Sequence, residues 1–142
     1  MENIRLKIVL PHKMLPVEEA ERIIIPAVKG NLTVLIGRAP TTLLLTNGVL
    51  DVLNEDNETV EKYFIQGGVA NVAADECEIV TQKAINAKDI TKEEAQSLKY
   101  ARYKELQAMK QVFPNQSPEE MDSDSEFYEF VYQYLLKEEN ED

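Results

Sequence analysis

The sequence predicts a β + α protein, in which an N-terminal antiparallel β-sandwich or barrel is followed by a C-terminal hairpin of two helices. Up to about residue 84, turn-forming residues separate short runs of β-branched residues and leucines at intervals of roughly six to twelve positions, which is typical of sandwiches and barrels. From residue 91 onward, apolar residues recur at helical spacing. We therefore expect a β-sandwich domain in residues 1–86 and a helical hairpin domain in residues 87–142, with an acidic linker near residues 114–125.

The first strands are expected at the N-terminus and in an apolar stretch at residues 23–50. Residues 4–8 alternate apolar and basic side chains, as in a strand with one buried face. Pro11 and Pro16 restrict the next segment to a turn or a sheet edge, because proline cannot donate a hydrogen bond to a neighbouring strand. A further strand begins at residue 20. Turn-forming residues divide the stretch that follows, namely Pro26, Gly30, Gly37, Pro40 and Asn47-Gly48.

The dipeptide Asn47-Gly48 is the strongest hairpin signal in the chain. Both residues tolerate the positive φ of a type I′ turn, and apolar runs flank them. We therefore expect residues 49–53 to form an antiparallel hairpin with the preceding strand. Polar residues 54–57 then form a turn, and Gly67-Gly68 allows a sharp turn or a bulge. The remaining strands are expected at residues 59–66, 69–73 and 76–82.

Two helices are expected after the strands. Thr91 and Glu94 have the spacing of a capping box, and no glycine or proline follows until Pro114 ends the first helix. Arg102 interrupts the apolar stripe of this helix, so we expect only part of its length to be buried. The second helix has an aromatic face with i, i+3, i+4, i+7 and i+8 spacing, formed by Phe127, Phe130, Val131, Tyr134 and Leu135.

The net charge of −11 is concentrated at the C-terminus. Residues 119–142 contain ten acids and one base, whereas residues 1–118 contain 16 acids and 14 bases. Nucleic acid is an unexpected partner, because no basic face is available to neutralise phosphates. The apolar runs are far shorter than the ~20 residues of a membrane span, and no early segment resembles a signal peptide. The single cysteine, Cys77, excludes an internal disulfide and is interpreted as a small hydrophobic residue in a strand.

The sequence predicts no catalytic site, cofactor site or metal site. His12 is the only histidine, which argues against a catalytic triad and most catalytic zinc sites, and we interpret it as a solvated turn residue. Gly67-Gly68 is followed neither by Lys-Ser/Thr nor by a helix, as a phosphate loop requires. The acids of residues 122–126 lack the glycine and the terminal glutamate of a calcium-binding loop, and we interpret them as a solvated linker.

Two groups of residues resemble the epsilon subunit of bacterial F-type ATP synthase. The first group consists of Pro26, Gly30, Leu32, Val34-Leu35, Gly37, Ala39-Pro40, Leu43 to Leu45 and Gly48-Val49-Leu50. The second group is the aromatic strand and double glycine at residues 63–69. The order and spacing of the two groups match the family over roughly residues 4–85.

The resemblance implies a non-catalytic central-stalk subunit of a rotary, proton-translocating ATP synthase. In that family the sandwich binds the gamma subunit and the membrane ring of c subunits, and so couples rotation to ATP synthesis. The helical hairpin lies against the sandwich, or extends along gamma towards the catalytic alpha/beta hexamer and inhibits ATP hydrolysis. The resemblance thus implies a peripheral location at the cytoplasmic face of the cell membrane, with the membrane reached only through the complex.

The sequence departs from the family pattern at three places. The family often has a carboxylate after the glycine that matches Gly30 and a histidine before Ala-Pro, both facing the c ring, where this chain has Asn31 and Arg38. We expect ring-side contacts from Lys29, Asn31 and Arg38. The family's Asp-x-x-Arg-Ala motif aligns with residues 91–95, which lack the arginine, so no nucleotide site is expected. The last helix is acidic where the family's is basic, which predicts weak or absent inhibition.

The sequence is also compatible with a function of a different class. The chain could be a free-standing β-sandwich adaptor whose acidic helical tail recruits a basic partner. An enzyme acting on small molecules has little support, because no acid–base pair can be assigned. Co-purification with gamma and the c ring would distinguish a stalk subunit from an adaptor.

Overall fold

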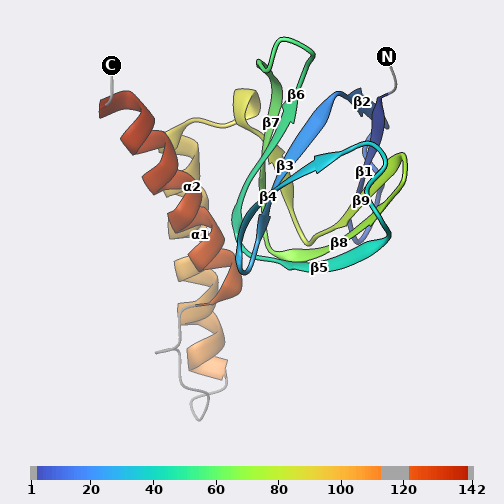
Figure 1. The fold of residues 1–142 in the computed structure, drawn as a ribbon. Coiled ribbons are helices and arrows are strands. Elements are labelled where there is room, and N and C mark those ends of the chain that lie inside the picture. The colour runs from blue at the N-terminus through green and yellow to red at the C-terminus, as the bar shows by residue number, and fades with distance from the viewer. Residues whose placement is uncertain (1–2, 113–121, 141–142) are drawn as a thin grey trace. The chain divides into compact units, whose positions relative to one another are not determined.

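The computed structural model describes residues 3–112 and 122–140 (Figure 1). Contacts between Cα atoms divide the chain into two compact units, Met1–Asp89 and Ile90–Asp142. The first unit contains β1 (Ile4–Val9), β2 (Glu18–Ala20), β3 (Arg22–Ala27), β4 (Gly30–Leu35), β5 (Thr41–Leu45), β6 (Gly48–Leu53), β7 (Thr59–Ile65), β8 (Gly68–Ala73), β9 (Glu76–Val80), β10 (Ala84–Asn86) and the 3-10 helix η1 (Ala87–Asp89). The second unit contains α1 (Lys92–Val112) and α2 (Ser123–Asn140).

The strands form one strongly bent sheet with the order β10-β7-β6-β3-β5-β8-β9-β1-β2, and β4 pairs with β3. The pairings are antiparallel except for the parallel pair of β1 and β9. β3 meets β5 only where Ala27 lies opposite Leu45, and the sheet bends there from one layer to the other. Figure 1 shows the two layers, with β3, β6 and β7 on one side of the core and β1, β9, β8 and β5 on the other. The predicted β-sandwich is therefore confirmed.

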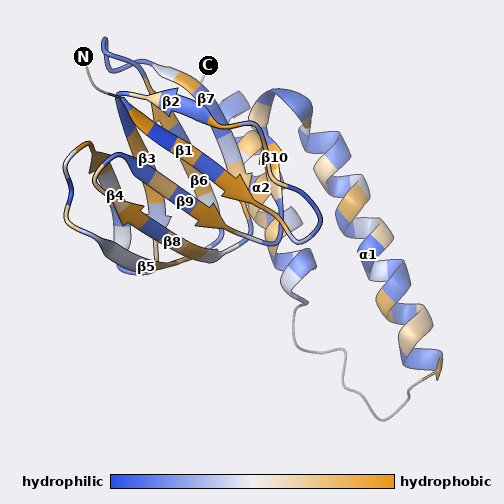
Figure 2. Cartoon of the chain, turned by 90° about the vertical axis from the view of Figure 1, so that its right-hand side faces the viewer, coloured by the Kyte–Doolittle hydropathy of each residue, from blue (hydrophilic) through white to orange (hydrophobic). Residues whose placement is uncertain are grey.

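Alternating side chains fill the space between the layers. In β1, Ile4, Leu6 and Ile8 are buried while Arg5 is exposed, as the sequence predicts. In β9 the buried positions are Cys77 and Ile79, and Figure 2 shows the same alternation of hydrophobic and hydrophilic residues along β1 and β9. The apolar core draws on most of the strands; its buried members are Ile4, Leu6, Ile8, Ala20, Ile23, Ile25, Val34, Leu45, Leu50, Val52, Tyr63, Ile65, Ala70, Val72, Cys77 and Ile79.

The hairpin predicted at Asn47-Gly48 is wrong. Within the described sheet, β5 pairs with β8 and β3, whereas β6 pairs with β7 and β3, so the two strands that flank Asn47-Gly48 are not partners. Gly48 is needed for a different reason, because a Cβ atom there would lie 2.5 Å from the Cβ of Pro26. The hairpin of this region joins β6 to β7 instead, and Asn57 in its turn has a φ of 62°.

The helical unit confirms the two expected helices and corrects the end of the linker. The predicted capping box forms: Glu94 N donates to Thr91 Oγ1 (3.2 Å), and Thr91 N donates to Glu94 Oε1 (3.3 Å). α2 begins at Ser123, inside the range expected to be linker, because Asp122 Oδ2 accepts a hydrogen bond from Ser125 N at 3.3 Å and so caps the helix. The Asp122 carboxylate also pairs with Arg102, so it is not the solvated linker residue that the sequence suggested. Phe113, Pro114 and most of the predicted linker lie outside the described residues.

Candidate partner-binding surface

The three residues expected at the c ring lie on or beside β4. Lys29 is in the two-residue turn between β3 and β4, where Ala27 pairs with Gly30, and Asn31 is in the first part of β4. Both are exposed, whereas Arg38 is half-buried in the loop that follows β4. Because a six-residue strand extends roughly 20 Å, Lys29 and Arg38 are separated by about that distance along β4. The structure therefore brings Lys29 and Asn31 together but places Arg38 at the opposite end of the strand.

A row of apolar side chains crosses the outer face of the layer formed by β5, β8, β9 and β1. Leu44 lies opposite Val69, Val69 opposite Val80, and Val80 opposite Val9. Residues directly opposite one another point to the same face of a sheet, and the neighbours of these four in their strands belong to the core, so the row points outward. Leu44 is 67% exposed and Val80 is 41% exposed.

Val28 extends the row to the turn that holds Lys29. Its backbone N donates to the carbonyl oxygen of Leu44 (2.9 Å), and its side chain is 62% exposed. We call Val9, Val28, Leu44, Val69 and Val80 the apolar row. In Figure 2 the ends of β1 and β9, where Val9 and Val80 lie, are coloured as hydrophobic. The apolar row thus runs up to the tip of the β3–β4 hairpin.

A polar ladder lies beside the apolar row, two residues along each strand. Thr42 Oγ1 donates to Asn71 Oδ1 (3.0 Å), and Asn71 Nδ2 donates to Glu78 Oε1 (3.4 Å). Lys7 lies opposite Glu78, and its Nζ is 3.3 Å from Glu76 Oε1. Thr42, Asn71, Glu76 and Glu78 border a surface hollow of about 390 Å³. An apolar strip next to an ordered set of polar groups is the composition of a protein–protein contact surface.

Sequence reasoning did not find the apolar row, because the signal depends on strand pairing. Leu44 lies in a run of three leucines, and the pattern alone does not say which of the three faces outward. Val69 and Val80 are single residues in different strands, and only the register of β5, β8 and β9 aligns them with Leu44. A sequence argument with the correct strand order would have found the row, but the mistaken hairpin at Asn47-Gly48 pairs β5 with the wrong strand.

Two titratable groups with displaced pKa values, Tyr63 and Cys77, lie in the interior of the strand unit. Tyr63 OH donates to Glu18 Oε1 (2.9 Å), and burial together with this hydrogen bond raises the pKa of Tyr63. Burial raises the pKa of the Cys77 thiol to about 12, so this thiol stays protonated and unreactive at neutral pH. Cys77 is 0% exposed, which confirms its interpretation as a small buried hydrophobic residue. His12 is exposed in the turn after β1.

The described residues contain neither a metal-binding cluster nor a helix that could span a membrane. Among residues 3–112 and 122–140, no cluster of three or more His, Cys, Asp or Glu side chains is arranged to hold a metal ion. Neither of the described α-helices has an apolar stretch that is long enough to cross a bilayer.

Comparison with known proteins agrees with the fold. Residues 3–87 match the family model described as ATP synthase, Delta/Epsilon chain, beta-sandwich domain. The chain is also similar to one in the cryo-EM structure of Euglena gracilis mitochondrial ATP synthase, OSCP/F1/c-ring in rotational state 1. That similarity has a TM-score of 0.67 at 25% sequence identity, and it covers 97% of this chain and 82% of the other.

Individual relatives carry the same description. The ATP synthase epsilon chain of Gluconacetobacter diazotrophicus is 32% identical over 108 residues, which cover 76% of this chain and 73% of that one. The mitochondrial ATP synthase subunit delta of Yarrowia lipolytica is 34% identical over 100 residues, covering 69% of this chain and 61% of that one. The chain therefore belongs to the delta/epsilon family of ATP synthase subunits.

Proposed function

We propose that this central-stalk subunit joins the gamma subunit to the membrane c ring and transmits rotation between them, without catalysing a reaction itself. The observation that carries the proposal is the apolar row beside the β3–β4 hairpin tip. Exposed apolar side chains that gather on one face of a sheet mark a contact with another protein. A subunit that links two partners needs two contact surfaces, and here the apolar row and the hairpin tip meet at Val28.

We assign the apolar row to gamma and the hairpin tip to the c ring. The row is uncharged and suits the buried centre of a lasting contact within the rotor. Lys29 and Asn31 are exposed and polar, and they suit the polar loops of a membrane ring. For Arg38 to contact the ring as well, β4 has to lie along the ring surface, because Lys29 and Arg38 stand at its two ends.

Glutamate substitutions in the apolar row test the contact with gamma. We expect Leu44→Glu and Val80→Glu to weaken binding to gamma by about 30-fold or more, because a buried contact residue becomes a desolvated charge. Val60→Glu is the matched control, since Val60 on β7 is 43% exposed, Val80 is 41% exposed, and Val60 lies outside the row. Binding is measured by co-purification and titration with gamma. Wild-type affinity of both row variants would rule out this surface.

The hairpin tip is tested by proton-coupled ATP synthesis in membrane vesicles. We expect Lys29→Glu to lower coupling while binding to gamma is retained, since only the ring contact is altered. Arg38→Glu is measured beside it, and reduced coupling by both variants means that β4 lies along the ring. If neither variant changes coupling, the ring contact lies elsewhere on the subunit.

We further propose that the helical unit inhibits ATP hydrolysis weakly or not at all. Residues 119–142 carry ten acids and one base, and this charge is repelled by acidic segments of the catalytic subunits. Truncation after Asp89 removes the whole helical unit, and we expect the remaining strand unit to fold, bind gamma and leave the hydrolysis rate of the complex nearly unchanged. A many-fold rise in hydrolysis would show that the helices inhibit despite their charge.

The location follows from the proposed role. A stalk subunit reaches the membrane through the c ring, and we propose that it works as a peripheral subunit at the cytoplasmic face of the cell membrane. The adaptor alternative is disfavoured by the structure of α2, because Glu129 and Glu139 already pair with Lys99 and Lys92 of α1 and do not form a free acidic face. Immunodetection in membrane fractions with and without the c ring tests the location.

A further inference from the structure

The two helices of the C-terminal unit carry opposite net charges. α1 has five bases and three acids, a net charge of +2, whereas α2 has five acids and one base, a net charge of −4. The helices pack against each other, so the basic helix lies beside the acidic one. Opposite charges on adjacent surfaces stabilise the pairing of the two helices and disfavour their separation.

Ion pairs connect the helices along the length of α2. Lys92 in the first turn of α1 pairs with Glu139 near the end of α2, and Lys99 Nζ is 2.5 Å from Glu129 Oε2. Further along α1, Arg102 pairs with Asp122, the residue that caps α2. In each of these pairs the base belongs to α1 and the acid belongs to α2 or its cap. These three ion pairs therefore favour the pairing of α2 with α1 in one antiparallel register.

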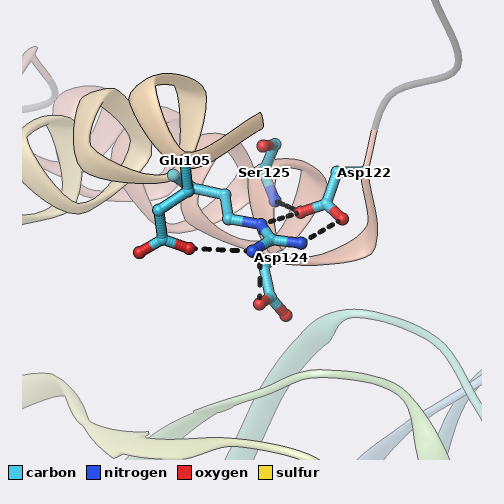
Figure 3. A network of polar contacts seen from close by, with 5 residues as sticks. Glu105, Asp122, Asp124 and Ser125 are labelled. Carbon is cyan, nitrogen blue, oxygen red and sulfur yellow. Dashed lines mark hydrogen bonds and ion pairs between the residues drawn. The ribbon is translucent and has the colours of Figure 1, made fainter. Parts of the chain in front are cut away.

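Arg102 joins two carboxylates, those of Asp122 and Glu105, in the polar network drawn in Figure 3. Its Nε donates to Asp122 Oδ2 at 2.7 Å and its Nη2 donates to Asp122 Oδ1 at 2.9 Å, which is a bidentate pair. Its Nη1 donates to Glu105 Oε2 (2.9 Å), and Asp124 Oδ2 lies 4.0 Å from Nε. Since Asp122 also accepts the hydrogen bond from Ser125 N, one carboxylate joins α1 to the first turn of α2.

The Arg102–Asp122 pair is partly shielded from solvent, and both of its members stay charged. The Arg102 and Asp122 side chains are only 24% and 21% exposed, so solvent and salt screen their attraction less than they screen a fully exposed pair. The hydrogen bonds to Asp122 raise the pKa of Arg102, and the bond from Arg102 lowers the pKa of Asp122, so both groups stay charged at neutral pH. In α1, the only buried residue is Ala95, so apolar burial on this helix is small.

We propose that these ion pairs form a latch, with Arg102–Asp122 at its centre, that keeps α2 paired with α1 and makes the helical unit move as a closed pair. The latch opens when its charges are neutralised or when salt screens them. This inference concerns the helical unit alone and does not rest on the proposed role in a rotary complex. Its regulatory consequence is that α2 is not available as a free arm at ordinary ionic strength.

The test measures the distance between the helices in the full-length chain. Spin labels are attached at Ala101→Cys on α1 and Glu126→Cys on α2, both exposed positions outside the latch. Cys77 is fully buried and stays unlabelled. We expect one narrow distance distribution for the otherwise wild-type chain at low salt. With Arg102→Gln we expect a second, longer population, and a ratio of separated to paired helices that rises about tenfold, because a charged hydrogen-bonded pair is lost.

Two controls separate the latch from a general effect of charge. Lys104→Gln removes one base from the same helix, but Lys104 lies over the Tyr100 ring and belongs to no ion pair of the latch, so we expect the wild-type distribution. The exchange Lys99→Glu with Glu129→Lys keeps the opposite charges of a pair that caps neither helix, and we expect it to keep the short distance that Lys99→Glu alone lengthens. A distribution in Arg102→Gln equal to that of wild type would overturn the proposal.

Salt supplies a second measurement that does not depend on a variant. Raising the ionic strength from 0.01 M to 1 M shortens the screening length from about 30 Å to about 3 Å. We expect the longer distance to grow in the labelled wild-type chain over this range, with helical content by circular dichroism retained. Arg102→Gln should respond less, because its central pair is already absent. A salt-independent distribution in the wild-type background would also overturn the latch.

Discussion

The strand unit and the helical unit are stabilised by different kinds of contact. In the strand unit a continuous apolar cluster lies between two sheet layers, and residues such as Ile23, Leu50 and Ile79 are 0% exposed. In the helical unit the buried residues of the described helices are Ala95 in α1 and Ser125, Phe127 and Val131 in α2. Ion pairs between α1 and α2 accompany this smaller buried set.

This difference predicts how each unit responds to its surroundings. Burial of apolar surface depends little on salt or on pH, so the strand unit should keep its structure across a wide range of both. Ion pairs between partly exposed groups depend on salt and on protonation, so the helical unit should be the part that changes. The role in rotation proposed above requires a rigid contact surface, and a tightly packed sandwich suits that requirement.

The largest effect is expected from a cavity in the core. Leu50→Ala should lower the free energy of unfolding of the strand unit by about 2–5 kcal/mol, because the removed methyl groups leave a hole in a packed interior. Leu44→Ala is the matched control, since Leu44 is 67% exposed and should change the value by less than about 0.5 kcal/mol. Urea titrations followed by circular dichroism measure both. Equal losses in the two variants would mean that Leu44 is packed in solution.

A smaller change is expected in the pairing of α1 with α2 when the pH is lowered. The hydrogen bond from Arg102 lowers the pKa of Asp122, and that from Lys99 lowers the pKa of Glu129. A carboxylate whose pKa is lower in the folded state stabilises that state above its unfolded pKa, about 3.9 for Asp and 4.3 for Glu, and the contribution disappears as pH falls through the folded value. We expect pairing of α1 with α2 to weaken below about pH 4 by at most ~1 kcal/mol per pair, since these groups are partly exposed.

Spin-label distances at a series of pH values measure this change. Arg102→Gln is the control, because its Asp122 has lost the partner that lowers its pKa, and its acid response should be smaller. The strand unit, followed by its own circular dichroism signal, should pass through the same range unchanged. Acid sensitivity confined to the strand unit would contradict the expectation that the pH-dependent contacts belong to the helical unit.

Local patterns predicted the elements of this chain better than their pairing. The alternation in residues 4–8 predicted β1 with its buried face, and Thr91 with Glu94 predicted the start of α1, because the contacts involved lie within a few residues of each other. Gly67-Gly68 was predicted as a turn, and both glycines have positive φ values, of 56° and 117°. These features depend mainly on residues that are close together in the sequence.

Features that depend on distant partners were not predicted. Gly48 was interpreted through its neighbour Asn47, whereas its small size is required by Pro26, more than twenty residues earlier in the sequence. Arg102 was interpreted as an interruption of an apolar stripe, but it faces Asp122 on the other side of the linker. The apolar row likewise requires the register of β5, β8, β9 and β1. In each case the deciding contact joins segments whose pairing the sequence does not specify.

The smallest effect is expected from the ion pair of Arg5 and Asp75 in the strand unit. Arg5 Nη2 lies 3.4 Å from Asp75 Oδ2, and the two side chains are 53% and 61% exposed, so water and salt screen their attraction. We expect a double-mutant cycle with Arg5→Gln and Asp75→Asn to give a coupling of less than about 0.5 kcal/mol. The same cycle with Arg102→Gln and Asp122→Asn should give a clearly larger coupling, since that pair is bidentate and less exposed. Equal couplings in the two cycles would show that geometry and exposure do not set the strength of these pairs, and the ion pairs of the helical unit would then have no special role in holding α1 and α2 together.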